Sequence, residues 1–363
     1  MKRACSRCER TSVPNSLFCP ELDCPAELAP GLFEAGERLG DIEVVRTIVT
    51  TRCATLYEAL QQGERVFLKV AAPGEFNTRR LQREARFLRT VRADRRRSPV
   101  FPRLRAPYTS TTIKTDPFGM IVVEGELLYF YLIDPVEGES LQDLLLKQPQ
   151  WWVNHVGWVA MQLATAINQM HLKDVYHLGL GPSSVLARFD STPDVPRVVL
   201  WDLGVISDRA NLAGDWYPEY VLPAYLAPEL VGGADATISA SVASDVHSLG
   251  VVLYEMLVGQ PAFPYRLATE AQIRDAVARG RRVEMDRVED VAAVANIAVR
   301  AAATDPGDRF RTAAEVVEEL AAVVGPVPTK KKRGRPSGDF ILVVIVAVIV
   351  AVLLIMVAIA MSQ

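Results

Sequence analysis

The sequence predicts an α+β protein that consists of one folded domain, a small cysteine-rich segment before it and one membrane-spanning helix after it. Three observations predict this organisation. Residues 38–325 mix strand-like and helix-like patterns without an internal repeat. Four of the five cysteines fall in the first 24 residues, and every residue from Phe340 to Met361 is apolar. A chain of 363 residues is long enough for the domain to have its own core.

The cysteine-rich segment, residues 1–30, predicts a structural zinc site of the zinc-ribbon type. Its thiols are Cys5, Cys8, Cys19 and Cys24, in the pattern C-x2-C, ten residues, C-x4-C. Two such pairs can place four thiolates around one Zn²⁺ and organise a segment that is too short to have a core. Four unligated thiols are the alternative. Cys53 lies elsewhere and is predicted to be a small buried residue.

The apolar run predicts a C-terminal membrane anchor. As a helix, residues 340–361 would span about 33 Å, enough to cross a hydrocarbon core of about 30 Å. A helix buried in a protein core would carry a polar face, and this run has none. The preceding linker, residues 326–339, carries five basic residues, and positive charge stays on the cytoplasmic side. We therefore expect a single-pass membrane protein with cytoplasmic N-terminal domains and its C-terminus outside.

Two charged residues of the folded domain are predicted to pair. The stretch VFLKVA alternates like a strand and carries Lys69 among apolar residues. The following RRLQREARFLRTV reads as a helix, in which Leu81, Glu84, Leu88 and Val91 share one face. An inward-facing carboxylate is costly unless it is paired, so Lys69 and Glu84 are natural partners. Two unrelated surface charges are the alternative.

From this point the chain resembles the eukaryotic-type Ser/Thr protein kinases found in bacteria, and the resemblance implies a bilobal protein-kinase-like fold. FLKV is similar to the strand motif that carries the family's lysine, and REARFL to the helix whose glutamate pairs with it. Further matches follow in the family's order: LLYFYLIDPVEGESLQDLL (127–145) for the hinge, VVLWDLGVI (198–206) for the D-F-G strand, AYLAPEL (224–230) for A-P-E, ASDVHSLGVVLYEMLVGQPAF (243–263) for a central helix, and DPGDRF (305–310).

The departures from the family pattern concern the chemistry. The glycine-rich loop is replaced by IVTTRCATLYEA (48–59), in which Val49, Thr51 and Ala54 stand at the glycine positions. YHLGLGPSSVL (176–186) stands where H-R-D-L-x-x-x-N is expected. It keeps His177, but Leu178, Gly179 and Ser184 replace the Arg, Asp and Asn, and Gly181 replaces a lysine. The proton acceptor and one magnesium ligand are therefore absent from the sequence.

The resemblance implies which residues keep a role. Lys69, Glu84 and Asp202 are candidates for holding phosphate and one Mg²⁺, and the backbone of Asp134 and Val136 for pairing with adenine. With the glycines replaced, ATP and magnesium binding stays open. His177, Asp245 and the pair Glu229–Arg309 are expected to be structural. The sequence thus favours a membrane-anchored pseudokinase that acts as a scaffold or allosteric partner for signalling proteins, such as a phosphorylated partner or an active kinase.

Two basic clusters and two other functions complete the prediction. Nine arginines lie between Arg79 and Arg97, which indicates a solvated helix face or, alternatively, a docking patch for an anionic lipid or a phosphorylated partner. R-G-R-P (333–336) resembles the AT-hook core that binds DNA, but a juxtamembrane basic segment explains the charge without nucleic acid. A divergent active Ser/Thr kinase or other ATP-dependent transferase is the first alternative function, and a membrane-tethered AT-hook and zinc DNA-binding protein is the second.

Overall fold

The computed structural model describes residues 33–92, 99–107, 116–123, 125–191, 194–216, 221–231, 239–263, 268–287 and 290–328. The four cysteines of the predicted zinc segment and the apolar run 340–361 lie outside these ranges. Within them, no helix has both the length and the apolar character needed to cross a membrane. The same ranges contain no group of three or more His, Cys, Asp or Glu side chains suited to a metal ion.

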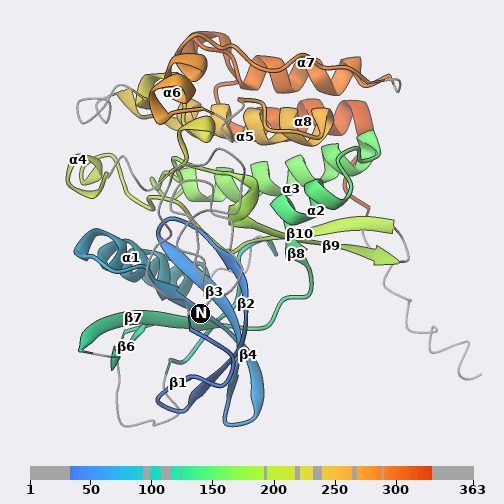
Figure 1. The fold of residues 1–363 in the computed structure, drawn as a ribbon. Coiled ribbons are helices and arrows are strands. Elements are labelled where there is room, and N and C mark those ends of the chain that lie inside the picture. Colours follow the sequence, from blue (N-terminus) through green and yellow to red (C-terminus); the bar gives the residue numbers. More distant parts are fainter. Residues whose placement is uncertain are drawn as a thin grey trace, which may run out of the picture. The chain divides into compact units, whose positions relative to one another are not determined.

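The N-terminal lobe is a curled antiparallel sheet of seven strands with one helix against it (Figure 1). The sheet order is β1-β2-β3-β4-β7-β5, and β6 pairs with β7. The strands are β1 (Arg38–Leu39), β2 (Ile42–Thr50), β3 (Ala54–Gln61), β4 (Glu64–Ala71), β5 (Leu104–Arg105), β6 (Gly119–Val123) and β7 (Glu126–Ile133). Both faces of β4 are buried, because Leu68 and Val70 pack inside the curl while Phe67 and Ala71 face the main core. Lys69 lies on the face of Phe67.

Helix α1 (Glu75–Arg92) confirms the predicted helix and begins four residues earlier. Leu81, Ala85, Leu88 and Val91 are buried in the main core, which is the apolar stripe that the spacing predicts. Glu84 lies on the same stripe and is also buried, so its carboxylate points into the protein rather than into water.

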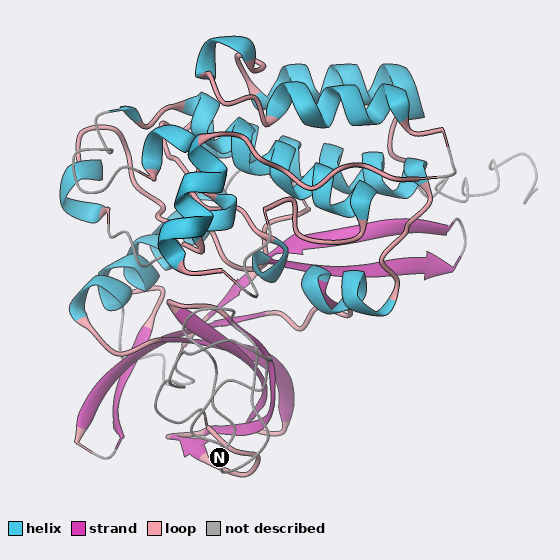
Figure 2. Ribbon diagram, turned by 45° about the horizontal axis from the view of Figure 1, so that its top comes forward, coloured by secondary structure: helices cyan, strands magenta, loops and turns pink. Residues whose placement is uncertain are grey.

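The C-terminal lobe is mainly helical (Figure 2). Its long helices α3 (Val153–His171), α5 (Val242–Val258) and α8 (Ala313–Val324) pack together, and a small sheet β10-β9-β8 lies beside α3. The remaining elements of this lobe are β8 (Glu139–Ser140), α2 (Leu141–Lys147), β9 (Val185–Ser191), β10 (Asp194–Leu200), α4 (Leu212–Asp215), α6 (Glu270–Ala278) and α7 (Ala292–Ala301). Helix α5 begins at a capping box of Ser241 and Ser244 and ends at Gly259, whose φ of 81° suits glycine.

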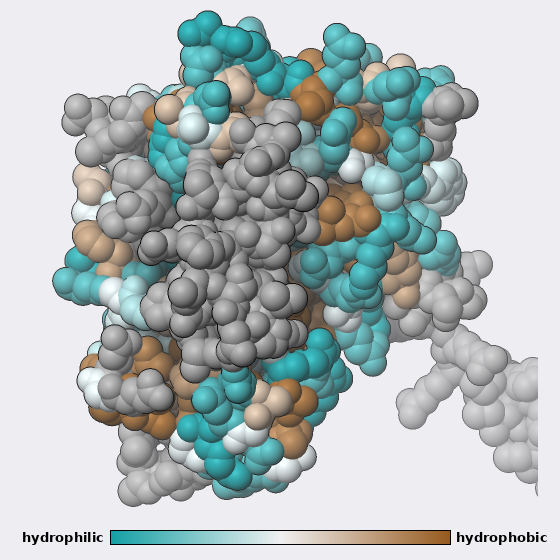
Figure 3. Space-filling view, viewed as in Figure 1, coloured by the Kyte–Doolittle hydropathy of each residue, from teal (hydrophilic) through white to brown (hydrophobic). Residues whose placement is uncertain are grey.

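The outer hairpin of the N-terminal sheet carries an apolar patch. Met120 and Val122 on β6 and Leu127 on β7 are each at least half exposed, and Val122 pairs directly with Leu127. Figure 3 shows this patch in brown at the lower left, over β6 and β7.

Candidate nucleotide and catalytic site

The predicted pair of Lys69 and Glu84 is present at the junction of β4 and α1. Lys69 Nζ lies 2.8 Å from Glu84 Oε1 and 2.6 Å from Oε2, and both side chains are fully buried. Glu84 Oε1 also accepts a hydrogen bond of 2.8 Å from the backbone N–H of Leu203. Burial raises the pKa of Glu84 above its ordinary value, and the charge of Lys69 opposes this rise. Helix α1 is therefore fixed both to the sheet and to the D-L-G segment.

The carboxylate of Asp202 is surrounded by cations and donors of the protein itself. Arg80 Nη2 contacts Asp202 Oδ1, and Lys69 Nζ lies 3.4 Å from the same oxygen. Thr51 Oγ1 donates to Asp202 Oδ2 at 3.2 Å, and the Gly204 N–H donates to Oδ1 at 3.2 Å. Burial acts to raise the pKa of Asp202, but Arg80 and then Lys69 outweigh it and hold that pKa well below its usual range.

Arg80 is a site residue that the sequence analysis missed. Its side chain is only 3% exposed, and its Nε also donates to the carbonyl oxygen of Gly204. Arg80 is four residues before Glu84, so the two side chains lie on the same side of α1. That spacing from an inward-facing glutamate is the signal in the sequence that could have identified Arg80.

The turn between β2 and β3 closes onto the C-terminal lobe. Arg52 Nη2 lies 3.0 Å from Glu270 Oε1 on α6. Cys53 is buried, as predicted, and it packs in one apolar cluster with Leu178 and Val221 of the other lobe. Thr51 reaches Asp202 from the same turn. Side chains therefore fill the place where the family's glycine-rich loop covers phosphates.

The space left between these groups is very small. A cavity of about 20 Å³ remains, and its lining includes Thr51, Arg80, Gly179, Asp202 and Val221. This volume holds about one water molecule. The cavity beside Asp202 is therefore much smaller than a triphosphate group.

Gly179 stands at the position of the family's catalytic aspartate. The space beside it is filled from the activation segment, which runs from the D-L-G motif to the A-P-E motif (residues 202–229). A Cβ atom at Gly179 would lie 2.3 Å from Val221 Cγ2 and 2.7 Å from its Cγ1. At Gly181 a Cβ would lie 3.3 Å from the ring of Tyr225. Ser184 is buried, and its carbonyl oxygen accepts from the Trp201 N–H at 3.1 Å. The described loop thus carries no carboxylate at the position of the family's catalytic aspartate.

Asp245 on α5 accepts hydrogen bonds from the backbone of the loop that corresponds to the family's catalytic loop (residues 176–186). Its Oδ2 accepts from the His177 N–H at 2.9 Å and its Oδ1 from the Leu178 N–H at 2.6 Å, while His171 Nε2 lies 2.8 Å from Oδ2. His177 Nε2 in turn lies 3.0 Å from the carbonyl oxygen of Asp202. Burial lowers the pKa of His177. Because a carbonyl oxygen can only accept, Nε2 is the nitrogen that donates to Asp202. Through these contacts His177 and Asp245 connect the loop to α5 and to the D-L-G segment.

The activation segment is fixed by contacts of two kinds. Leu178, which replaces the family's arginine, is buried in the apolar cluster together with Trp216 and Leu226. From α1, Arg83 Nη1 donates to Asp215 Oδ1 at 2.7 Å, and Arg83 Nη2 donates to the carbonyl oxygen of Val205 at 3.1 Å. The arginines of α1 are therefore not a uniformly solvated face, and the surface interpretation is wrong for Arg80 and Arg83.

The remaining predicted residues lie as follows. Arg309 Nη2 contacts Glu229 Oε2 at 2.8 Å, which fixes the end of the activation segment. Asp134 and Val136 are half-buried in the connection between β7 and β8, and the Asp134 N–H donates to the carbonyl oxygen of Arg103 at 2.8 Å. Cys5, Cys8, Cys19 and Cys24 lie outside the described residues, as do Arg333 and Arg335.

Comparisons with known proteins show the family and the fold of this chain. A family model described as the protein kinase domain matches residues 120–320. Serine/threonine-protein kinase PknB of Mycobacterium tuberculosis is 27% identical over 251 residues, which cover 65% of this chain but only 38% of PknB. PkaA of Streptomyces coelicolor is 30% identical over 163 residues, which cover 45% of this chain and 29% of PkaA. The crystal structure of the Mycobacterium tuberculosis PknI kinase domain superposes with a TM-score of 0.51 at 20% identity, covering 80% of this chain and 99% of that one.

Proposed function

Because the chain belongs to the protein kinase family, we propose that it is a pseudokinase, a kinase fold without phosphotransferase activity that serves as a signalling scaffold or allosteric partner. One observation carries the proposal: the carboxylate of Asp202 is occupied by Arg80, Lys69 and Thr51. In active kinases this aspartate and the catalytic-loop asparagine hold the metal ions that bridge the phosphates.

The residues present do not fit a magnesium ion. Mg²⁺ requires oxygen ligands in a near-octahedral arrangement. Asp202 already has two cationic side chains against its carboxylate, and Ser184 replaces the asparagine. A further cation there would be repelled by Arg80 and Lys69. Arg80 thus supplies from within the protein the positive charge that a metal ion supplies in active members of the family.

The proton-transfer chemistry is missing as well. A positioned general base contributes about 10²- to 10⁴-fold to a rate, and Gly179 offers none. Val221 occupies the adjoining space, so no other side chain can enter there without a shift of the activation segment. The loop is kept for the contacts of His177 with Asp202 and Asp245.

The scaffold proposal follows from what holds the two lobes together. The contacts of Arg80 with Asp202, of Thr51 with Asp202 and of Arg52 with Glu270 all join the N-terminal lobe to the C-terminal lobe. In active kinases nucleotide and metal ions bind in this cleft. Here side chains take their place, so the surfaces that a partner would recognise are formed without a ligand.

The test is phosphotransfer by the purified full-length chain in detergent micelles. It is incubated with labelled ATP, Mg²⁺ or Mn²⁺ and generic protein acceptors, beside a Lys69→Ala control. We expect equal incorporation for the two proteins. Incorporation that depends on Lys69 would overturn the proposal.

A divergent active kinase is the second candidate, and the intact pair of Lys69 and Glu84 favours it. This pair must form in active protein kinases, and here α1 is in the position that forms it. The discriminating measurement is the melting temperature with and without ATP·Mg²⁺. A rise that is abolished by Asp202→Ala would support this candidate, whereas an unchanged melting temperature supports the pseudokinase.

The membrane anchor and the zinc ribbon are part of the same proposal. The apolar run 340–361 and the basic residues before it support a single pass with the kinase-like domain on the cytoplasmic side. Extraction of membranes with alkaline carbonate should leave the full-length chain in the pellet and release a chain truncated at residue 339. Release of both would contradict the anchor.

A further inference from the structure

A basic groove lies between α1 and the first part of the activation segment, and it shares no lining residue with the cavity beside Asp202. One wall is the stripe of α1 that carries Arg79, Arg83 and Arg86, spaced four and three residues apart. The other wall includes side chains from residues 206–215, which end in α4, and Figure 1 shows α1 and α4 on the same side of the molecule. The volume of the groove is about 640 Å³, which is typical of a ligand site.

The side chains that line the basic groove carry an excess of positive charge. Four are cationic and two are carboxylates, so the excess amounts to two charges. The cations are Arg79, Arg83, Arg86 and Lys173, and the carboxylates are Asp208 and Asp215. The groove therefore attracts an anion, and a doubly charged one most strongly.

Both carboxylates of the groove have partners within the protein. Asp215 accepts from Arg83 Nη1 at 2.7 Å and from the Ser207 hydroxyl at 2.6 Å. Asp208 accepts from the backbone N–H of Asn211 at 2.9 Å and from its Nδ2 at 2.8 Å, and these hydrogen bonds lower the pKa of Asp208. Within the described residues, neither carboxylate forms an ion pair with the outer two arginines of the stripe.

These two arginines, Arg79 and Arg86, present their guanidinium groups to a ligand. The side chain of Arg79 is 45% exposed, and its Nη2 lies 3.6 Å from Oε1 of Glu75, a weak pair because both side chains are exposed. Arg86 is exposed and packs 5.3 Å from the centroid of the Phe118 ring rather than against a carboxylate. A guanidinium group has five N–H donors in one plane, and two of them can bind two oxygens of the same phosphate.

We propose that the basic groove binds a phosphorylated serine or threonine side chain of a partner protein. A phosphate monoester carries a charge of about −1.5 to −2 at pH 7, which matches the excess of two positive charges. The Cα atoms of Arg79 and Arg86 are about 10 Å apart along α1, so both long side chains can reach one phosphate between them. Arginine clusters are a recurrent site for phosphorylated motifs.

Two other anions match the basic groove less well. A carboxylate side chain has one charge and would leave half of the excess unmatched. The surface of an anionic bilayer is flat, and elements that bind to it insert exposed apolar side chains. Among the described residues, none of the exposed large apolar side chains lines the basic groove, and its arginines face a recess.

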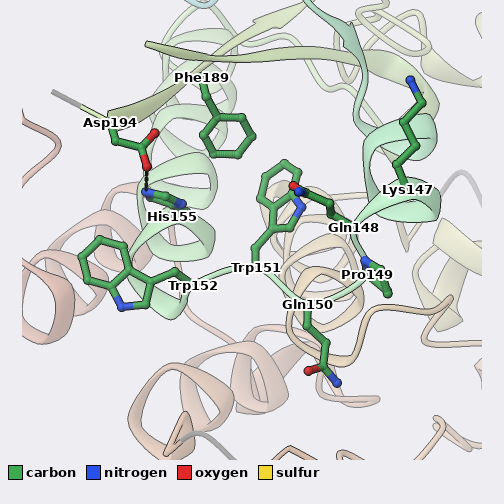
Figure 4. Close-up of a pocket in the computed structure, with 9 residues that line it drawn as sticks. All are labelled: Lys147, Gln148, Pro149, Gln150, Trp151, Trp152, His155, Phe189 and Asp194. Atoms are coloured by element: carbon green, nitrogen blue, oxygen red, sulfur yellow. Dashed lines mark ion pairs between the residues drawn. The ribbon is translucent and has the colours of Figure 1, made fainter. Parts of the chain in front are cut away.

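Volume alone does not distinguish the basic groove, because a second recess is nearly as large. Figure 4 shows this recess, of about 590 Å³, on the C-terminal lobe. Its lining contains one lysine, Lys147, which is in an ion pair with Glu139, and one carboxylate, Asp194, which lies beside His155. The lysine and the aspartate balance each other, so this recess should not bind a phosphorylated side chain.

The inference gives the proposed scaffold a class of partner and rests on that proposal for its biological use. The test is fluorescence anisotropy with the full-length chain in detergent micelles. The probe is a pool of fluorescein-labelled heptapeptides with one central phosphoserine among random uncharged residues, so that no single sequence decides the result. One control pool has serine at the centre, and another has glutamate. Since the titration contains no nucleotide, its failure would leave the phosphotransfer result unaffected.

We expect saturable binding of the phosphoserine pool only. Arg79→Gln and Arg86→Gln should each weaken it by about tenfold or more, because each removes a charge-assisted contact with the phosphate. Arg279→Gln is the matched control, since Arg279 is an exposed arginine outside the groove that pairs with Asp275 four residues before it, as Arg79 pairs with Glu75. It removes the same charge from the chain and should leave binding unchanged.

Two competitors separate the sources of phosphate. Inorganic phosphate and short-chain phosphatidylserine should displace the labelled pool only at concentrations far above that of unlabelled phosphoserine peptides. Displacement by either at an equal concentration would assign the groove to a free anion or to a lipid headgroup and overturn the inference.

Four further results would overturn it. They are no saturable binding of the phosphoserine pool, equal binding of the serine or glutamate pool, full binding by Arg79→Gln and Arg86→Gln, and an equal loss with Arg279→Gln. Melting temperatures of the three variants should match that of the unmodified chain, since the substituted side chains are exposed.

Discussion

Gly179→Ala tests whether Val221 fills the space of the missing base. The added methyl would lie 2.3 Å from Val221 Cγ2, which is a severe overlap in a buried place. Overpacking of this kind costs about 1–3 kcal/mol, so the free energy of unfolding should fall by that amount. Val221→Ala alone removes two buried methyl groups and should cost about 2 kcal/mol.

The free energy of unfolding of the double variant shows whether the two positions interact. If the overlap is with the Val221 methyls, Gly179→Ala combined with Val221→Ala should cost about 1–2 kcal/mol less than the sum of the single changes. Gly214→Ala is the matched control, because no atom lies within 4 Å of a Cβ there, and it should stabilise the chain by about 0.4–1 kcal/mol. The assay is urea unfolding of the full-length chain followed by tryptophan fluorescence.

An unchanged stability of Gly179→Ala, or additive costs in the double variant, would refute this placement of Val221. The same overlap predicts that Gly179→Asp does not restore phosphotransfer. The larger side chain would have to displace the activation segment, and Asp202 would still be held by Arg80.

Three further changes test the contacts around the cleft and the cysteine segment. Arg80→Ala removes the main cation that pairs with the buried carboxylate of Asp202 and should lower the free energy of unfolding by about 3 kcal/mol or more. Because the pKa of Asp202 is lowered in the folded protein, its ionised carboxylate stabilises the fold fully above the ordinary aspartate pKa, and this stabilisation fades as the pH falls towards the lowered value. Melting temperatures measured from acid to neutral pH should show that Arg80→Ala loses stability at a higher pH than the unmodified chain. The same loss of stability in both proteins at acid pH would contradict this. Arg52→Ala removes the ion pair with Glu270 and truncates a side chain that is only 7% exposed, so it should cost about 1–3 kcal/mol and amide hydrogen exchange in β2 and β3 should accelerate; unchanged exchange would show that the pair does not hold the turn. Cys5→Ser should lower bound zinc in elemental analysis from about one ion per chain, and a metal-free unmodified chain would disprove the zinc site.

The sequence was sufficient to predict the contacts of residues whose role depends on a local pattern. The alternation of β4 and the stripe of α1 placed Lys69 and Glu84 facing each other, and the structure confirms their contact. The order of the motifs likewise predicted the pair of Glu229 and Arg309. These pairs follow from spacing within one element or from a family pattern, and both are readable in a linear sequence.

The side chains that fill the cleft between the two lobes could not be predicted in the same way. Arg80 and Arg83 stand in a run of nine arginines, and apart from the four-residue spacing between Arg80 and Glu84 nothing nearby in the sequence separates them from exposed ones such as Arg79. The difference is that Asp202 and Asp215, more than 120 positions later, lie within their reach. The approach of Val221 to Gly179 is also a contact between distant segments, and no periodicity predicts it.

The hold of Arg83 on Asp215 has a consequence for control of the protein. In many kinases this segment becomes ordered only when an upstream enzyme adds a phosphate that arginines can grip. In this protein Arg83 binds the carboxylate of Asp215 instead of a phosphate, and Leu178 adds apolar contacts. In the part of this segment that the structure describes, these contacts come from encoded side chains and require no added phosphate.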